Sequence, residues 1–460
     1  MKREHEKELL EIVKKLESLD DNFSTYISAL EKPMKEMKEA VQRIETLATE
    51  AEQEGEIEVL KAIFHQVMPF FDELDATYQS IYLSLEATKT SPTRKNLNEA
   101  RKLCASFNEF VHIVVDSTAN TGDYILGRCT RLLVEKTALP DVDWKIQHVI
   151  NRVDEHYIDM CNRSKGIVIG GGGLLLKDTN PNSFSGWTWP CPTELLKKIE
   201  KPIYVLGIGY NRFRGQADFD ECFTESINTL VEKSAFFGLR NHGSMRAVKK
   251  YLREELHDKV KFHPCATTVL AKLRELPERR IEEPFVAVNF ALDRGTLRYG
   301  KRLESIVLSI VAVVAELSKC YKIKVYVQCK GDEQIAAFIR RAEVPCEVVT
   351  LTTELTEEEY MRHFTEPELV LATRGHAQMI PFGCKTPVIS IISHDKLAWF
   401  LEDINHPEWG IDIEDEAFGT KLLEKAEYML QHREEICLQI EKAQEELWEI
   451  MQENMKCITI

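Results

Sequence analysis

The stretch LVLATRGH at residues 369–376 decides the fold class. Its four aliphatic residues are typical of a short buried strand, and the polar turn at Thr373 to His376 ends that strand directly before helical sequence. Further strand-like runs alternate with helical stretches on both sides of it. Parallel sheets require this order of elements, so the chain is predicted to belong to the α/β class.

Two alternating units are expected, because a segment rich in proline and charge at 273–284 divides the strand-like runs into two sets. We expect one Rossmann-like domain at 109–274 and a second at 284–414, which face each other across a cleft. The predicted strands are 110–115, 166–169, 203–207 and 235–239 in the first domain, and 285–290, 324–328, 347–350, 368–372 and 388–392 in the second.

Helical segments flank these two domains. Residues 1–108 are predicted to form an all-α appendage, with apolar residues at the alternating three- and four-residue steps of a coiled-coil-like seam: Leu9, Ile12, Leu16, Leu19, Phe23, Tyr26 and Leu30. Such a seam forms a helical hairpin within the chain or a contact in a homo-oligomer. Residues 415–460 are amphipathic and are expected to form C-terminal helices that pack on the domains.

The composition excludes several classes of protein. The chain has 460 residues, 44% hydrophobic and 29% charged, which is typical of a globular protein and unlike disordered, collagenous or disulfide-stapled chains. Its net charge of −16 repels polyanions, so no nucleic-acid partner is expected. No signal-peptide core or transmembrane segment is recognisable, and twelve scattered cysteines indicate neither disulfides nor a metal site. We therefore expect a cytoplasmic protein.

Candidate site residues follow the predicted strands, because ligands of open α/β sheets bind beyond the carboxyl ends of the strands. Asn120 and Asp123 lie in such a turn, where they either reach a ligand or only cap the next helix. The run of four glycines at 170–173, which includes Gly171 and Gly172, would let backbone N–H groups converge on an anion. A tight turn alone would also explain that run.

Three further strand ends carry charged side chains. Arg240 follows one strand, with Ser244 near the start of the next helix, and an arginine fork binds carboxylate or phosphate bidentately. Arg374 and His376 place a permanent cation beside a group whose proton is mobile near neutral pH. Lys396 follows the next strand and adds a cation at the same edge of the sheet.

In their order and spacing these motifs resemble the polysaccharide pyruvyl transferase family from about Val111 to Ile404. The resemblance implies a GT-B-like pair of Rossmann-type domains and transfer of the pyruvyl group of phosphoenolpyruvate to sugar hydroxyls as a ketal. It implies that Arg240 and Arg374 bind the anionic groups of the donor and that His376, as imidazolium, donates a proton. Its remaining substrate-binding residues would be Ser244, Lys396, Gly171, Gly172, Asn120 and Asp123.

The chain departs from the common family pattern at three places. Gly375 stands where leucine is usual, Ser393 to Asp395 replace a stretch that contains tyrosine, and His263 to Cys265 replace an Asp-Pro pair. The resemblance implies no cofactor besides the donor, and a glycan precursor, including a lipid-linked one, as acceptor. A GT-B glycosyltransferase that uses a nucleotide sugar and a binding or assembly module without turnover remain alternatives.

Overall fold

The computed structural model describes residues 109–117, 119–140, 142–177 and 182–458. The helical appendage that the sequence predicts for residues 1–108 lies outside the described residues. The self-association expected of that appendage therefore stays a prediction. Contacts between Cα atoms separate residues 1–105 from residues 106–460, and all that follows concerns the second of these units.

The first domain is built on a parallel sheet with the order β2-β1-β3-β5-β6-β7, and a short strand β4 pairs beside β5. The strands are β1 (Glu109–Val114), β2 (Asp143–His148), β3 (Gly166–Ile169), β4 (Gly172–Leu175), β5 (Ile203–Tyr210), β6 (Ser234–Leu239) and β7 (Val260–Phe262). The helices are α4 (Thr121–Thr137), α5 (Glu155–Arg163), α6 (Thr193–Lys197), α7 (Glu221–Lys233), α8 (His242–Lys249) and α9 (Leu270–Leu273), with 3-10 turns at Glu254–Lys259 and Ala266–Val269.

The second domain has the strand order β10-β9-β8-β11-β12-β13, and every pairing is parallel. The strands are β8 (Phe285–Asn289), β9 (Lys322–Val327), β10 (Glu347–Thr350), β11 (Leu369–Ala372), β12 (Val388–Ile392) and β13 (Gly410–Asp412). The helices are α10 (Gly295–Tyr299), α11 (Leu303–Leu317), α12 (Gln334–Arg341), α13 (Glu357–Thr365), α14 (Gly375–Gly383) and α15 (Asp395–Asp403), with 3-10 turns at Gly300–Arg302 and Pro407–Trp409. Counted within the domain, this is the 3-2-1-4-5-6 order of a Rossmann fold.

Local sequence explains why several helices begin where they do. The side chains of Asn120, Asp154, Asp220 and Asn241 each accept a hydrogen bond from a backbone N–H in the first turn of the following helix. Thr356 and Glu359 form a capping box at the start of α13. The central strands β3, β5, β8 and β11 are buried along their whole length, as parallel strands covered on both faces must be.

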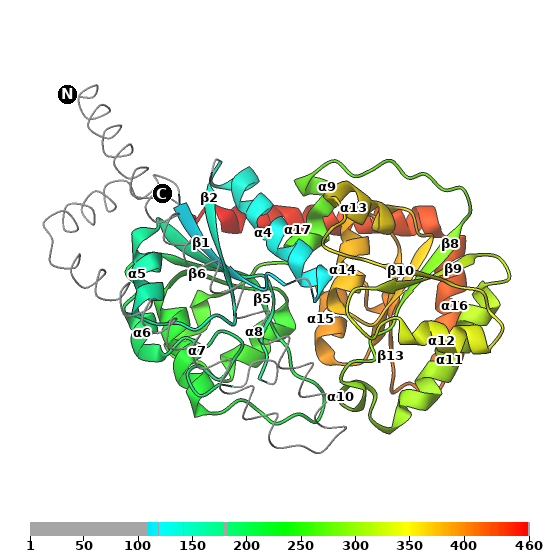
Figure 1. Ribbon diagram of the computed structural model, residues 1–460, viewed down its shortest axis with the longest axis horizontal. Helices are drawn as coiled ribbons and strands as arrows, with labels where there is room; N and C mark the ends of the chain where they lie inside the picture. Colours follow the sequence, from blue (N-terminus) through cyan, green and yellow to red (C-terminus); the bar gives the residue numbers. More distant parts are fainter. Residues whose placement is uncertain (1–108, 118, 141, 178–181, 459–460) are drawn as a thin grey trace, which may run out of the picture. The chain divides into compact units, whose positions relative to one another are not determined.

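The C-terminal segment forms α16 (Phe418–Gln431) and α17 (Arg433–Met455), and α17 contacts both domains. Near its start α17 binds the second domain, where Lys385 forms an ion pair with Glu441 at 2.8 Å. Near its end it binds the first domain, where Asn454 Nδ2 donates to the carbonyl oxygen of Phe262 at 2.8 Å. Figure 1 shows α17, in red, extended along both sheets. None of the helices in the described residues is long and apolar enough to cross a membrane.

The two domains also contact each other directly, through α8 and α15 and through α4 and α14. Glycine is required at the first contact, because a Cβ atom on Gly243 of α8 would overlap the indole ring of Trp399 on α15. One face of the first sheet, including Phe110, Val168 and Leu206, therefore shares a continuous apolar core with the second domain.

We expect Gly243→Ala to lower the free energy of unfolding by about 1 to 3 kcal/mol, because the added methyl group overpacks the contact between α8 and α15. Gly295→Ala is the matched control, since its Cβ would lie 3.4 Å from the nearest atom, Leu303 Cδ2, which is ordinary contact. Urea unfolding measures both. A Gly243→Ala protein as stable as Gly295→Ala would contradict the close packing of these helices.

Candidate active site

A cavity of about 360 Å³ lies at the carboxyl ends of both sheets, where the two domains meet. Its walls include the segments that follow β1, β6, β8, β11 and β12. In each sheet the strand order reverses at the first strand, at β1 and at β8, and open α/β sheets bind their ligands at such reversal points. Because both reversal points open onto this cavity, we take it as the candidate binding site between the two domains.

His376 begins the first turn of α14 and is buried, with 7% of its surface exposed. Its Nδ1 lies 3.3 Å from Asp123 Oδ1 of the other domain, while Nε2 is buried without a partner in the described residues. Burial lowers the pKa of His376 to about 4, while the Asp123 carboxylate raises it and the charges of Arg240 and Lys396 lower it. The surroundings of the imidazole in the ligand-free protein thus favour its neutral form.

Arg240 follows β6 and is 5% exposed. Its Nε and Nη2 atoms are buried and have no hydrogen-bond partner among the described residues, and no carboxylate pairs with it there. Burial lowers the pKa of this guanidinium below its ordinary value. Gly209 in β5 makes room for it, because a Cβ atom there would overlap Arg240 Nε. The guanidinium group of Arg240 is thus held at the cavity wall, with its Nε and Nη2 donors not engaged in hydrogen bonds to the described residues.

Lys396 lies in the first turn of α15 and lines the same cavity. The side chain is only partly buried, and within the described part of the chain its ammonium group has neither a hydrogen bond nor an ion pair. Burial lowers its pKa well below the ordinary value, and the charges of Arg240 and Arg298 lower it further. Lys396 and Arg240 therefore repel each other in the absence of an anion between them.

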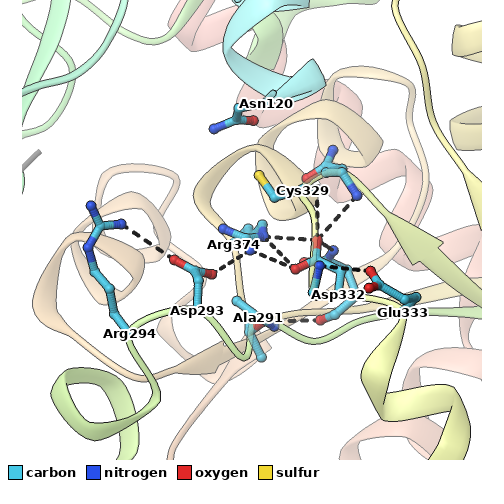
Figure 2. A network of polar contacts seen from close by, with 12 residues as sticks. Asn120, Ala291, Asp293, Arg294, Cys329, Asp332, Glu333 and Arg374 are labelled. Atoms are coloured by element: carbon cyan, nitrogen blue, oxygen red, sulfur yellow. Dashed lines mark hydrogen bonds and ion pairs between the residues drawn. The ribbon is translucent and has the colours of Figure 1, made fainter. Parts of the chain in front are cut away.

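Arg374 lines the cavity as well, but its charge is already balanced, as Figure 2 shows. Nε donates to Asp332 Oδ2 at 3.0 Å, and Nη2 donates to Asp332 Oδ1 at 2.6 Å and to Asp293 Oδ1 at 2.5 Å. Although burial alone would lower the pKa of Arg374, its hydrogen bonds with Asp332 raise it above the ordinary value. Arg374 keeps only Nη1 for a ligand, and the two carboxylates fix its position.

Asp332 holds this network together from a side chain that is 0% exposed. Its Oδ2 atom also accepts hydrogen bonds from the backbone N–H groups of Gln328 and Cys329 and from Asn289 Nδ2. The carboxylate thereby ties the ends of β8, β9 and β11 together at the cavity. Nothing in the sequence marked Asp332, because it lies 42 residues before its partner Arg374.

The segment after β8 adds two arginines that were not singled out from sequence. Arg298 is 7% exposed and donates from Nε to the carbonyl oxygen of Asp293 at 2.9 Å. Its guanidinium carbon lies 5.2 Å from the ring centre of Phe213, and that of Arg294 lies 5.9 Å from the same ring. Since both arginines follow a predicted strand, the strand-end argument would have found them.

The other predicted residues occupy different places. Asn120 and Asp123 line the cavity, but the Asn120 side chain is engaged in the helix start: Oδ1 accepts from the N–H of Gly122 at 3.1 Å and Nδ2 donates to Asp123 Oδ2 at 2.6 Å. Ser244 is buried away from the cavity lining, and its Oγ accepts from the N–H of Tyr210 at 3.0 Å. Asn120 thus acts as a helix cap, and Ser244 as an anchor between α8 and β5.

The glycine run differs from the expected anion cradle. It leads into strand β4 rather than into a helix, and Gly173, not Gly171 or Gly172, lines the cavity. A Cβ atom on Gly171 would lie 2.9 Å from Leu126 Cδ2, so this glycine serves packing against α4. Trp187 and Trp189 after it are fully buried and therefore cannot stack on a sugar from the cavity.

The charges at the cavity do not balance. Among the described lining residues, Arg240, Arg294, Arg298, Arg374 and Lys396 are cationic and Asp123 is anionic. Asp293 and Asp332 add two carboxylates through their bonds to Arg374 and Arg298. Five cations against three carboxylates leave a surplus of two positive charges, in a protein whose net charge is −16. No group of three or more histidine, cysteine or acidic side chains in the described residues is placed to hold a metal ion.

Two Rossmann-like domains with a basic cavity between their carboxyl edges define the chain as a two-domain α/β protein of the GT-B-like class. A family model of the polysaccharide pyruvyl transferases matches residues 120–395, which is more than half of the chain and includes every candidate residue except Lys396. The chain belongs to this family, and is by family a transferase.

Solved structures with a similar arrangement include UDP-GlcNAc 2-epimerases. That from Methanocaldococcus jannaschii has a TM-score of 0.43 at 14% identity, over 70% of this chain and 92% of that one. That from Neisseria meningitidis, bound to UDP-GlcNAc, has a TM-score of 0.44 at 10% identity, over 74% and 98%. A search of curated proteins finds no match.

We expect Asp332→Asn to lower the free energy of unfolding by about 3 kcal/mol, because it leaves a buried guanidinium without its main partner. Asp293→Asn should cost less, since the Asp293 side chain is 29% exposed and water can replace part of its charge. Urea unfolding at pH 7 compares the two variants. An Asp332→Asn protein as stable as the wild type would contradict the central place given to this carboxylate.

Proposed function

We propose that the cavity binds phosphoenolpyruvate and that the protein transfers its pyruvyl group to two hydroxyls of a sugar, in a polysaccharide or its precursor, with release of phosphate. One observation carries this proposal. Arg240, whose Nε and Nη2 are buried without a partner in the described residues, and the partly buried Lys396 line the same cavity as a histidine whose Nε2 is also buried and unpartnered there. Membership of the pyruvyl transferase family supports it.

Phosphoenolpyruvate would bring the negative charge that Arg240 and Lys396 do not find in the described residues. Phosphoenolpyruvate carries a carboxylate and a phosphate, and hydrogen bonds between ionised groups are about twice as strong as those between neutral ones. In the proposed complex Arg240 and Lys396 bind one of these anionic groups, and Arg298 with Arg374 Nη1 faces the other. The surplus of two positive charges at the cavity favours such a ligand electrostatically.

His376 performs the proton transfers in this proposal. The anionic donor raises its pKa, so that the imidazole takes up a proton at Nε2 on binding. The proton passes to the methylene carbon C3, the double-bond electrons form the new C–H bond, and C2 becomes electrophilic. The first sugar hydroxyl then bonds to C2 and returns its proton to Nε2, which restores the ionisation state of the histidine.

The second step completes the ketal. A second hydroxyl of the same sugar bonds to C2, the bond from C2 to the phosphate oxygen breaks, and the phosphate leaves with the electron pair. The proton of that hydroxyl goes to the phosphate. One donor and two hydroxyls therefore give one ketal and one inorganic phosphate, and no separate cofactor is needed.

The acceptor would occupy the uncharged part of the cavity. Ser117, His148 and Thr188 of the first domain line it there, beside apolar side chains that include Val115 and Leu176. This mixture of small polar and apolar groups suits a neutral sugar ring, whose hydroxyls need hydrogen bonds and whose carbon faces need apolar contact. The charged donor and the acceptor would then meet at His376.

Titration calorimetry with phosphoenolpyruvate tests donor binding. We expect Arg240→Met and Lys396→Met each to weaken binding by about 10- to 100-fold, because each removes a charge-assisted hydrogen bond worth about 1.5 to 3 kcal/mol. Arg246→Met is the matched control, since its side chain is 62% exposed on α8 and pairs with Glu402. Equal affinities in all four proteins would contradict the proposed donor site.

Turnover is tested by phosphate release from phosphoenolpyruvate with a panel of sugar and glycan-precursor acceptors. Acceptor-dependent release supports the proposed reaction. Release of a nucleoside diphosphate from a nucleotide sugar, without use of phosphoenolpyruvate, would instead identify a glycosyltransferase and overturn it.

Donor binding should also take up a proton. His376 is neutral above its free-state pKa of about 4, so binding at pH 7.5 draws a proton from the buffer if the donor raises that pKa. By linkage, affinity is greatest at low pH and falls as pH rises through the pKa of the complex. Calorimetry in buffers of different ionisation enthalpy measures the uptake, which His376→Gln should reduce; the remainder belongs to other groups that bind the anion, Lys396 among them. Equal uptake in both proteins would contradict this role.

A further inference from the structure

The contact between Asp123 and His376 joins the two domains at the point of proposed chemistry. Asp123 lies in the first turn of α4 in the first domain, and His376 lies in the first turn of α14 in the second. Asp123 Oδ1 is 3.3 Å from His376 Nδ1, and the two side chains are 21% and 8% exposed. Neither domain alone contains this pair.

Hydrogen bonds within the first domain fix the position of the Asp123 side chain. Its Oδ2 accepts a hydrogen bond from Asn120 Nδ2 at 2.6 Å, and its backbone N–H donates to Asn120 Oδ1 at 3.4 Å. These bonds engage Oδ2 and the backbone N–H of Asp123, whereas Oδ1 is the carboxylate oxygen that lies 3.3 Å from His376 Nδ1. Asn120 therefore orients Asp123 in addition to capping α4.

Gly122 permits the approach of the two helices. A Cβ atom at this position would lie 2.6 Å from His376 Cβ and 3.1 Å from His376 Nδ1, closer than side chains approach one another. Any larger residue would separate the imidazole from Asp123. The turn from Asn120 to Asp123 is thus shaped to receive the histidine of the other domain.

The carboxylate decides which nitrogen of the neutral imidazole carries the proton. An ionised Asp123 can only accept hydrogen bonds, so a hydrogen bond across the 3.3 Å between Oδ1 and Nδ1 would need Nδ1 as the donor and would leave Nε2 with its lone pair. The other charged groups that act on the imidazole are Arg240, after β6, and Lys396, on α15, and both are cations. Only Asp123 among these three stabilises the protonated form.

We propose that Asp123 is the positioning residue of the reaction: docked from the first domain, it holds Nδ1–H of His376 so that Nε2 exchanges protons with the donor and the acceptor. The effect of Asp123 on turnover rests on the proposed function, whereas the tautomer of His376 can be measured without any substrate. It assigns Asp123 to the histidine rather than to substrate binding.

The first test is the tautomer in the ligand-free protein. In protein labelled with ¹⁵N-histidine at pH 7.5, with His376 assigned by comparison with His376→Gln, the nitrogen shifts should report a proton on Nδ1. In Asp123→Asn that preference should be lost, whereas Asp159→Asn, at an exposed position of α5, should leave it unchanged. A proton on Nε2 in the wild type, or no change in Asp123→Asn, would overturn the proposal.

The second test is turnover, with phosphoenolpyruvate and an acceptor that the wild type uses. We expect Asp123→Asn to lower kcat by about 100-fold, within the range of general acid–base catalysis, and to change donor affinity by less than about threefold. Asp123→Glu, which keeps the carboxylate, should recover part of kcat and retain the tautomer. Unchanged kcat in Asp123→Asn would refute the positioning role. Failure of the wild type to use phosphoenolpyruvate would refute only the proposed function.

Discussion

Uncompensated positive charge at the cavity is the constraint on which the account of this protein depends. A buried charge without a partner costs several kcal/mol, so folded chains pair such groups or leave them for a ligand. Arg374 is paired with Asp332 and Asp293, whereas Arg240 is buried with Nε and Nη2 unpartnered in the described residues, and the partly buried Lys396 forms no ion pair there. The same cavity therefore contains one cation whose charge is balanced by carboxylates and two cations whose pKa is lowered by burial.

The two-domain architecture explains how these groups come together. Each sheet directs the carboxyl ends of its strands to the cavity, so side chains far apart in sequence meet there without any regular spacing between them. Close helix contacts then fix the geometry, with Gly122 against His376 and Gly243 against Trp399. Since α17 contacts both domains, their docking and the completion of the site are linked in the structure.

The sequence predicted the α/β class and nine of the thirteen strands in the described residues, because those runs are rich in apolar residues and end in polar turns. It missed β2, which has no buried residue and consists largely of charged and polar side chains, and the short strands β4, β7 and β13. At the site, the strand-end argument identified Arg240, His376 and Lys396, which line the cavity. It could not show that Arg374 is neutralised or that Gly171 packs on Leu126, because both depend on tertiary partners.

The distinction between paired and unpaired cations also explains why Arg374 and Arg240 are not equivalent, although the sequence presents both as arginines after a strand. Their difference is decided by Asp332, which the fold brings to one and not to the other. Function in this account is therefore set by where the carboxylates lie as much as by where the cations lie.

A crystal structure of the full-length protein soaked with phosphoenolpyruvate would locate the donor. We expect a phosphate or carboxylate group within hydrogen-bond distance of both Arg240 and Lys396, with the methylene carbon next to His376 Nε2. Density for the compound at another surface, or none at a concentration that saturates turnover, would contradict this expectation.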